Sequence, residues 1–206
     1  MSKRFGVVFL LVAIIAAGCS SAPAVTPSPT VVPTPGAIAV NPPVEIVDFT
    51  LIGQDGEATT LSALRGKIVL MAFGYTHCPD VCPVTLARFK QVKDSLGNLS
   101  RDVAFVFVSV DGERDTPERL NEYLPMFDPS FIGLTGEQDN VRAVISQYGG
   151  DFNIKDAEGL RKNYTVDHTA ASFLMDAEGR WVQTFEYNTA PDIIVNTIET
   201  VHNAAT

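Results

Sequence analysis

Ile68-Val69-Leu70-Met71-Ala72-Phe73 is a continuous apolar run that leads, four residues later, into Cys78-Pro79-Asp80-Val81-Cys82-Pro83. The run predicts a buried strand, and the residues from Pro83 to Leu96, which end at Gly97, have the apolar spacing of a helix. Two thiols therefore lie at a strand-to-helix junction. In open α/β sheets, ligands and chemistry are found at the carboxyl ends of strands, where this junction is expected.

Local sterics shape the segment between the two thiols. Cys78 and Cys82 each precede a proline, and a residue before proline is biased away from the α region. We therefore expect the regular helix to begin at about Pro83, with an irregular turn over its positive end that favours thiolate over thiol. Such a turn can close to a disulfide or open to hold an ion between the sulfurs. A purely structural bridge is disfavoured, because a bridge across so short a loop constrains the unfolded chain little.

Apolar runs alternate with helical patterns on both sides of this segment, which predicts one α/β domain over residues 44–206. Thr116 and Pro117 have the positions of a helix cap and a first helical residue. The expected strands are 67–73, 103–110 and 131–134, with hairpins formed by 44–52 and 59–61 and by 171–175 and 181–187. The expected helices are 83–96, 117–127, 137–148 and 191–202.

The N-terminus has the pattern of a secretory signal. Lys3 and Arg4 precede an apolar stretch over 5–17, and small residues lead into Cys19. The stretch is shorter than the roughly 20 apolar residues that a spanning helix needs. Its ending resembles a bacterial lipobox, so we predict a lipoprotein signal peptide over 1–18 and lipidation of Cys19. An uncleaved anchor and an ordinary cleavage are the alternatives, and each places the rest of the chain outside the cytoplasm, on the cell membrane.

Residues 19–43 are predicted to be a tether, because seven prolines lie among small residues after Cys19 and such a segment favours an extended conformation over a packed core. The formal charge of −9 becomes −11 when Lys3 and Arg4 leave with the signal (−9 − 2). This acidic balance argues against nucleic acid or anionic lipid as a partner and suits a positively charged ion or protein.

The chemistry of the donors decides what the thiols of Cys78 and Cys82 would hold. Two thiolates suit Cu(I), and with one imidazole they also accept Cu(II), whereas structural zinc normally has four protein ligands. Of the three histidines, His77 adjoins the first thiol and would reach a metal only by reversing its side chain, and His202 is expected to be exposed in the last helix. His168 is expected in a loop before the strand 171–175, which leaves it as a candidate ligand.

The segment from Phe73 to Pro83 resembles the signature of the Sco/SenC family of copper-binding, thioredoxin-fold proteins, and 108–118, 133–136 and 164–169 are similar to its later motifs. Gly112 departs from the proline that the family usually shows there. The resemblance implies a thioredoxin-like fold in which helices flank a central mixed sheet with an N-terminal β-hairpin. It also implies that Cys78, Cys82 and His168 are ligands for Cu(I) and Cu(II), with the two cysteines as a redox-active pair.

The resemblance also implies a function: delivering copper to the dinuclear copper A centre in subunit II of cytochrome c oxidase, or reducing the cysteines of that centre. The implied partners are subunit II and other copper chaperones or thiol reductases, and the protein would be a metallochaperone first and a thiol-disulfide reductase second. The main rival is a general extracytoplasmic thiol-disulfide oxidoreductase. Three residues separate Cys78 from Cys82 where thioredoxins have two, and 169–172 lack the proline of those enzymes. A thiol peroxidase usually has Thr or Ser three residues before its reactive cysteine, where this chain has Tyr75 and Pro79. An interaction module without chemistry fits the paired thiols less well.

Overall fold

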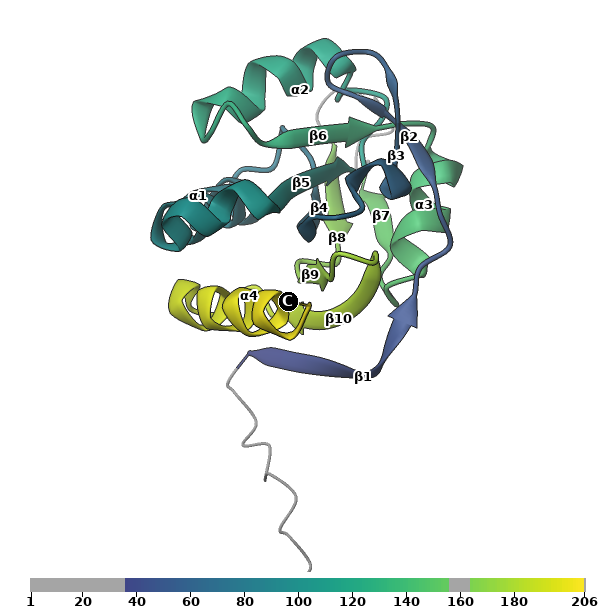
Figure 1. Cartoon of the computed structure of the whole chain (residues 1–206). Helices are drawn as coiled ribbons and strands as arrows, with labels where there is room; N and C mark the ends of the chain where they lie inside the picture. The colour runs from purple at the N-terminus through teal and green to yellow at the C-terminus, as the bar shows by residue number, and fades with distance from the viewer. Residues whose placement is uncertain (1–35, 156–163, 206) are drawn as a thin grey trace, which may run out of the picture. The chain divides into compact units, whose positions relative to one another are not determined.

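Two strands made entirely of buried residues form the centre of the fold, β4 (Ile68–Gly74) and β5 (Val103–Ser109), which pair in parallel. Strands buried on both faces are expected to be continuous apolar runs, which is the pattern that predicted them. The computed structural model describes residues 36–155 and 164–205. Within these ranges a mixed sheet has the strand order β1-β10-β9-β4-β5-β6-β2-β3 (Figure 1). The other strands of this sheet are β1 (Ala37–Glu45), β2 (Thr50–Gly53), β3 (Ala58–Thr60), β6 (Ile132–Thr135), β9 (Ser172–Met175) and β10 (Arg180–Phe185).

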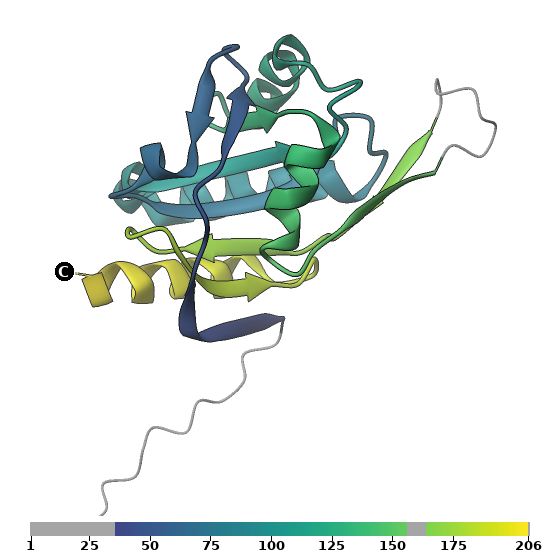
Figure 2. The same cartoon turned by 90° about the vertical axis from the view of Figure 1, so that its right-hand side faces the viewer.

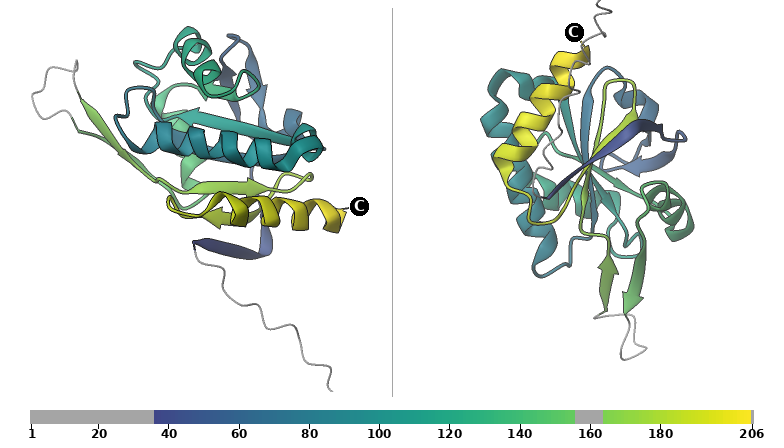
Figure 3. Two further views of the ribbon diagram at one scale, coloured as in Figure 1. Left: turned by 90° about the vertical axis from the view of Figure 1, so that its left-hand side faces the viewer. Right: turned by 90° about the horizontal axis from the view of Figure 1, so that it is seen from below.

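Helices cover both faces of the sheet. The helices α1 (Val81–Leu96) and α4 (Pro191–Ala205) lie side by side on one face (Figure 3), and α3 (Gln138–Ser146) lies on the other (Figure 2). The helix α2 (Pro117–Tyr123) packs beside β6 and is capped as expected, since the Thr116 side chain accepts a hydrogen bond from the backbone N–H of Arg119. Short 3-10 turns follow or join these elements: η1 (Leu61–Leu64), η2 (Gly97–Asp102) and η3 (Leu124–Met126).

These elements confirm a thioredoxin-like mixed α/β fold. The predicted N-terminal hairpin is present as β2 and β3, but its first strand begins at Thr50 and not at Val44, which belongs to β1. Gly56 lies at its turn in the left-handed region, at a φ of 84°. The predicted hairpin near the C-terminus is present as β9 and β10. The helix expected over 117–127 is regular only to Tyr123, because the chain then tightens into η3 at Leu124.

The strand β1 occupies residues that were assigned to the tether. It begins at Ala37 and pairs antiparallel with β10 at the edge of the sheet, and its register shifts between Ala39 and Val44. Proline cannot donate to a strand ladder and is tolerated mainly on edge strands, so Pro42 and Pro43 fit here despite the composition that suggested a tether. The predicted signal peptide, Cys19 and the tether before residue 36 lie outside the described residues.

A second, two-stranded sheet carries the candidate histidine. The strands β7 (Phe152–Lys155) and β8 (Thr165–His168) pair antiparallel and extend away from the main sheet (Figure 2). Neither strand was predicted, because each is only four residues long, although both alternate polar with apolar residues as half-buried strands do. His168 is paired with Phe152 at the base of this hairpin, so it lies in a strand and not in the expected loop.

Over the ranges described, no helix combines the length and the apolar character needed to cross a membrane.

Candidate metal centre

The two thiols lie at the junction between β4 and α1. The backbone N–H of Cys78 donates to the carbonyl of Tyr75 at 3.2 Å, which closes a turn directly after β4. The helix begins at Val81, two residues earlier than expected, so Cys82 lies in its first turn. Pro83 is tolerated there because the first N–H groups of a helix have no intrahelical partner. The N–H of Cys82 instead faces the Cys78 sulfur, at 3.4 Å.

A glycine makes room for the second sulfur. A Cβ atom on Gly74 would lie 2.8 Å from Sγ of Cys82 and 2.7 Å from a ring carbon of Phe107, closer than such contacts allow. Glycine at the end of β4 therefore lets Cys82 pack directly against the strand. Cys82 is only 2% exposed, and burial raises the pKa of its thiol despite its place in the first turn of α1. Burial therefore opposes the thiolate form that the helix N-terminus was expected to favour at Cys82.

His168 approaches this sulfur from β8. Its Nε2 lies 3.5 Å from Sγ of Cys82, and its Nδ1 lies 3.0 Å from the carbonyl oxygen of Thr169. A carbonyl oxygen only accepts, so Nδ1 carries the proton and Nε2 presents its lone pair to the sulfur. Burial lowers the pKa of His168, which favours this neutral form. Tyr75 packs edge-on against the imidazole, with ring centroids 6.0 Å apart, and so helps to fix its orientation.

The structure therefore brings together the three predicted ligands. The ligand atoms of Cys78, Cys82 and His168 all lie within 4.8 Å of one another, and both cysteines are free thiols. Cys78 is half-buried and lines a cleft of about 450 Å³ together with Tyr75, Val166 and His168. A soft metal ion would enter through this cleft and be bound by the two sulfurs and the imidazole nitrogen.

The other two histidines do not join this cluster. Nδ1 of His77 lies 3.7 Å from a carboxylate oxygen of Asp115 and 3.2 Å from Oγ1 of Thr76, so the ring turns away from the thiols. Its ligand nitrogen groups instead with the carboxylates of Asp111 and Asp115. His202 lies in α4 and is half-buried, where exposure was expected.

A buried carboxylate fixes the turn that carries the thiols. Asp115 has no exposed surface and accepts hydrogen bonds from the backbone N–H of Thr76 at 2.8 Å, from the Thr76 hydroxyl at 2.7 Å and from the Ser109 hydroxyl at 2.7 Å. Nε of Arg119 adds a bond to Oγ1 of Thr76 at 3.1 Å. The start of the Cys78 turn is therefore tied to the end of β5.

A second buried carboxylate, that of Asp111, fixes the start of β8, which carries His168. Asp111 is fully buried and accepts from Nε of Arg114 and from the Tyr164 hydroxyl, both at 2.5 Å. Arg114 also donates from Nη1 to the carbonyl of Tyr164 at 3.0 Å, and its guanidinium carbon lies 3.5 Å from the centroid of the Tyr164 ring. The loop after β5 is thus hydrogen-bonded to Tyr164, the residue just before β8. These contacts help to position His168 relative to the thiols.

Sequence reasoning assigned no role to Asp111, Arg114, Asp115 or Tyr164. A signal was present, because two aspartates four residues apart directly follow the buried strand β5, a position where polar side chains of α/β sheets converge on a site. The partners of these aspartates are distant in the chain. Tyr164 lies 53 residues from Asp111, and Thr76 lies 39 residues from Asp115.

Comparisons with known proteins identify the family of this chain. A family model described as SCO1/SenC matches residues 40–203. A SCO2-like protein of Rickettsia felis is 35% identical over 148 residues, which are 72% of this chain and 72% of that protein. Protein SenC of Rhodobacter capsulatus is 33% identical over 150 residues, which are 73% of this chain and 67% of that protein.

Solved structures of the same family superpose on the fold. ScoI of Bradyrhizobium japonicum with copper bound is 37% identical, with a TM-score of 0.69, and the match covers 77% of this chain and 99% of that one. Apo Sco1 of Thermus thermophilus in solution is also 37% identical, with a TM-score of 0.72, and the match covers 79% of this chain and 94% of that one. By sequence over most of its length and by fold, this chain belongs to the SCO1/SenC family.

Proposed function

We propose that this protein binds copper through Cys78, Cys82 and His168 and serves the assembly of the copper A centre in subunit II of cytochrome c oxidase. The observation that carries the proposal is the convergence of two free sulfurs and one imidazole nitrogen within 4.8 Å. Copper-bound relatives such as ScoI of Bradyrhizobium japonicum support the choice of metal. The donor set fits it as well, since thiolates suit Cu(I) and an added imidazole suits Cu(II).

We infer that the three ligands have different parts in copper transfer. Cys82 is buried and forms the inner wall, whereas His168 lines the cleft with Cys78 and is held by its Nδ1 hydrogen bond to Thr169. Cys78 lies at the cleft that opens to solvent, so an incoming sulfur of an acceptor protein meets the metal on that side. Transfer then proceeds by exchanging one sulfur ligand at a time, with Cys78 released first. The copper comes from other copper chaperones.

The same two thiols support a reductase step in place of copper delivery. In this step the Cys78 thiolate attacks a disulfide of the acceptor, and a mixed disulfide forms while one acceptor thiolate leaves. Cys82 then attacks the sulfur of Cys78, releases the second acceptor thiol and leaves the protein oxidised by two electrons. A thiol reductase restores the dithiol. The free, adjacent thiols in a thioredoxin-like fold also support the rival function, a general extracytoplasmic oxidoreductase.

The proposed location follows from the N-terminal sequence. The charged start, short apolar segment and small residues before Cys19 support export and lipidation. A lipid on Cys19 and the proline-rich segment after it would hold the domain outside the cytoplasm at the cell membrane, where copper A is assembled.

Mixing experiments separate delivery from reduction. Copper-loaded protein is mixed with the isolated soluble domain of oxidase subunit II, first with its cysteines reduced and then with them oxidised. If the protein delivers copper, the metal moves to the reduced domain and the copper A absorption appears. If it is a reductase, the oxidised domain gains two thiols while Cys78 and Cys82 form a disulfide. Neither transfer nor reduction with this acceptor, alongside reduction of unrelated disulfide proteins, would favour the general oxidoreductase.

A further inference from the structure

A cleft of about 780 Å³ lies beside the loop that braces the metal centre. Two residues of this loop, Asp111 and Asp115, bond to Tyr164 and to Thr76 on the side of the thiols. Gly112 and Glu113, which lie between them in the chain, line the cleft. The loop after β5 therefore forms a shared wall between the two sites.

The cleft exists because β2 and β6 diverge. Their pairing ends at Ile52 and Thr135, while β2 continues to Thr50 in register with β3. Beyond Thr135 the chain turns through Gly136 into α3 and leaves a gap beside β2. The loop after β5 approaches closely here, since a Cβ atom on Gly112 would lie 2.0 Å from the carbonyl oxygen of Gly136. Glycine, which has no Cβ, permits this backbone contact.

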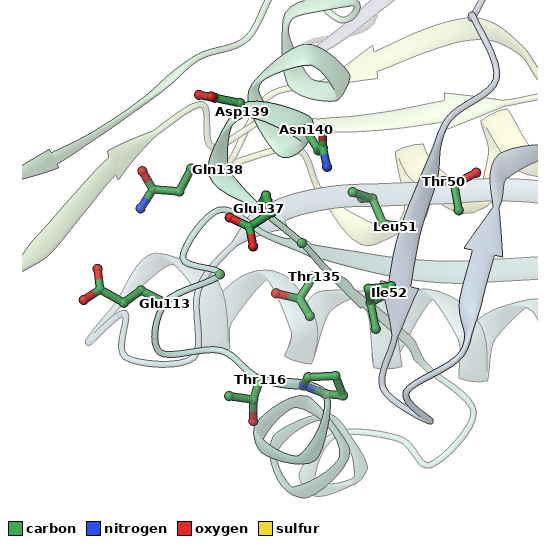
Figure 4. A pocket seen from close by; sticks show the side chains of 13 residues that line it. Thr50, Leu51, Ile52, Glu113, Thr116, Thr135, Glu137, Gln138, Asp139 and Asn140 are labelled. Carbon is green, nitrogen blue, oxygen red and sulfur yellow. The ribbon is translucent and has the colours of Figure 1, made fainter.

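The walls of the cleft differ in chemistry (Figure 4). In that view the Glu137 carboxylate faces the middle of the cleft from the start of α3, and Glu113 and Asp139 lie farther out on the same side. The opposite wall is apolar, with Ile52, which is 38% exposed, and a proline at the start of α2. Among the described residues that line the cleft there is no lysine or arginine. The start of α3 contributes roughly half a positive charge, which the carboxylates of Glu137 and Asp139 outweigh.

A buried hydroxyl at the floor points to a ligand. Thr135 is 5% exposed, and among the described residues its Oγ1 has no hydrogen-bond partner. Figure 4 shows this oxygen turned toward the same space as Glu137. A buried hydroxyl without a partner is destabilising, and buried polar groups are satisfied in most proteins. A donor bound in the cleft would supply the missing partner after a small rotation of the Thr135 side chain.

We propose that this cleft binds the side chain of a lysine or arginine presented by the partner with which the metal centre exchanges copper or electrons. The inference rests on the proposed function for the identity of that partner. Carboxylates and a hydroxyl accept from the cationic head, while the apolar wall at Ile52 packs on the alkyl stem. A bare metal ion fits less well, because among residues 36–155 and 164–205 neither Glu137 nor Asp139 belongs to a group that brings three ligand atoms within 4.8 Å.

Titration with a blocked tripeptide tests the proposal. Acetyl-Gly-Arg-Gly-amide is added to the ¹⁵N-labelled protein, and backbone NMR shifts are followed, with the citrulline peptide as an uncharged control of the same shape. We expect saturable shifts at Gly112 and Gly136 that require the charge and weaken as salt is added. Equal shifts with the citrulline peptide, or arginine-dependent shifts confined to other surfaces, would overturn the proposal.

Matched variants locate the binding. Glu137→Gln should raise the Kd of the arginine peptide about fivefold or more, since it removes a charge-assisted contact, whereas Glu199→Gln, an exposed position in α4, should leave it unchanged. Thr135→Val should also weaken binding without lowering the Tm, because it removes an unpaired hydroxyl. Equal Kd values for all of these variants and the wild type would overturn the proposal.

Copper loading of the same proteins keeps the two ideas apart. A wild-type protein that binds copper but not the arginine peptide contradicts only the cleft inference. A wild-type protein that binds the peptide but no copper contradicts the proposed function and leaves the cleft intact.

Discussion

Replacing Asp115 by alanine should destabilise the fold strongly, because this carboxylate is the acceptor for three buried donors. The donors are the backbone N–H of Thr76, the hydroxyl of the same residue and the hydroxyl of Ser109. Thr76 is 7% exposed, and Asp115 and Ser109 are fully buried, so water does not readily replace the lost acceptor. The perturbation acts at the point where β5 holds the turn before Cys78.

The expected size follows from those three contacts. A buried donor left without an acceptor costs about 1–3 kcal/mol. The backbone N–H of Thr76 is fixed in direction by the peptide plane, whereas the two hydroxyl groups can rotate toward other acceptors. We therefore expect Asp115→Ala to lower the free energy of unfolding by about 3–5 kcal/mol, and Asp115→Asn, which keeps one acceptor oxygen, by about 1–3 kcal/mol. Either loss is a large part of the roughly 5–15 kcal/mol that stabilises a typical domain.

Urea unfolding measures this loss. Trp181, the single tryptophan of the chain, packs against Tyr148 and Phe173 at centroid distances of 5.6 Å and 5.8 Å and reports unfolding by fluorescence. Asp94→Ala is the matched control, because this exposed aspartate forms an ion pair with Lys90 and exposed ion pairs contribute about 0–1 kcal/mol. If Asp115→Ala lost no more stability than Asp94→Ala, the role assigned to the buried carboxylate would be wrong.

The remaining predictions concern the ligands and their supports. Cys78→Ser and Cys82→Ser should each lose most of the Cu(I) affinity in competition with a chelator, because a hydroxyl replaces a soft thiolate poorly; tight, stoichiometric Cu(I) in both variants would contradict the chelating pair. Cys19→Ser should leave the protein unprocessed or released from the membrane with copper binding intact; cell fractionation that shows normal processing and membrane binding would contradict lipidation. Tyr164→Phe removes the hydroxyl that donates to Asp111, so Cu(II) titrations should show weaker binding, while Cu(I) affinity changes less; equal losses for both ions would contradict a specific effect on His168.

Much of the fold could be predicted from local sequence. The buried strands β4 and β5 are continuous apolar runs, and α2 begins at Thr116 and Pro117 as its capping pattern indicated. The edge strand β1 could not be predicted, because its pairing with β10 depends on distant residues, from Glu45 with Arg180 (180 − 45 = 135 positions) to Ala37 with Phe185 (185 − 37 = 148 positions). Prolines at an edge and prolines in a tether look alike in sequence.

The candidate site was predictable in part. The spacing of Cys78 and Cys82 identified the thiols, and the family resemblance identified His168. Local sequence missed that burial would raise the pKa of Cys82, since the room for its sulfur comes from Gly74 and not from the cysteine segment itself. It also missed the hydrogen bonds of Asp111 with Tyr164 and of Asp115 with Thr76. These partners lie 53 and 39 positions apart in the chain, and such distant contacts leave no local pattern.

The central claim is that copper is held by two sulfurs and one imidazole nitrogen. X-ray absorption at the copper edge, together with the thiolate-to-copper absorption band, tests it most directly on wild type and His168→Ala. With Cu(I), which two thiolates can bind, we expect two sulfur ligands in both proteins. The Cu(I) affinity of His168→Ala should be moderately lower than that of the wild type. With Cu(II), the wild type should show the thiolate band and an imidazole ligand, and His168→Ala should lose both or bind far more weakly. An unchanged Cu(II) spectrum in His168→Ala would contradict the account and make His77 the histidine to test next.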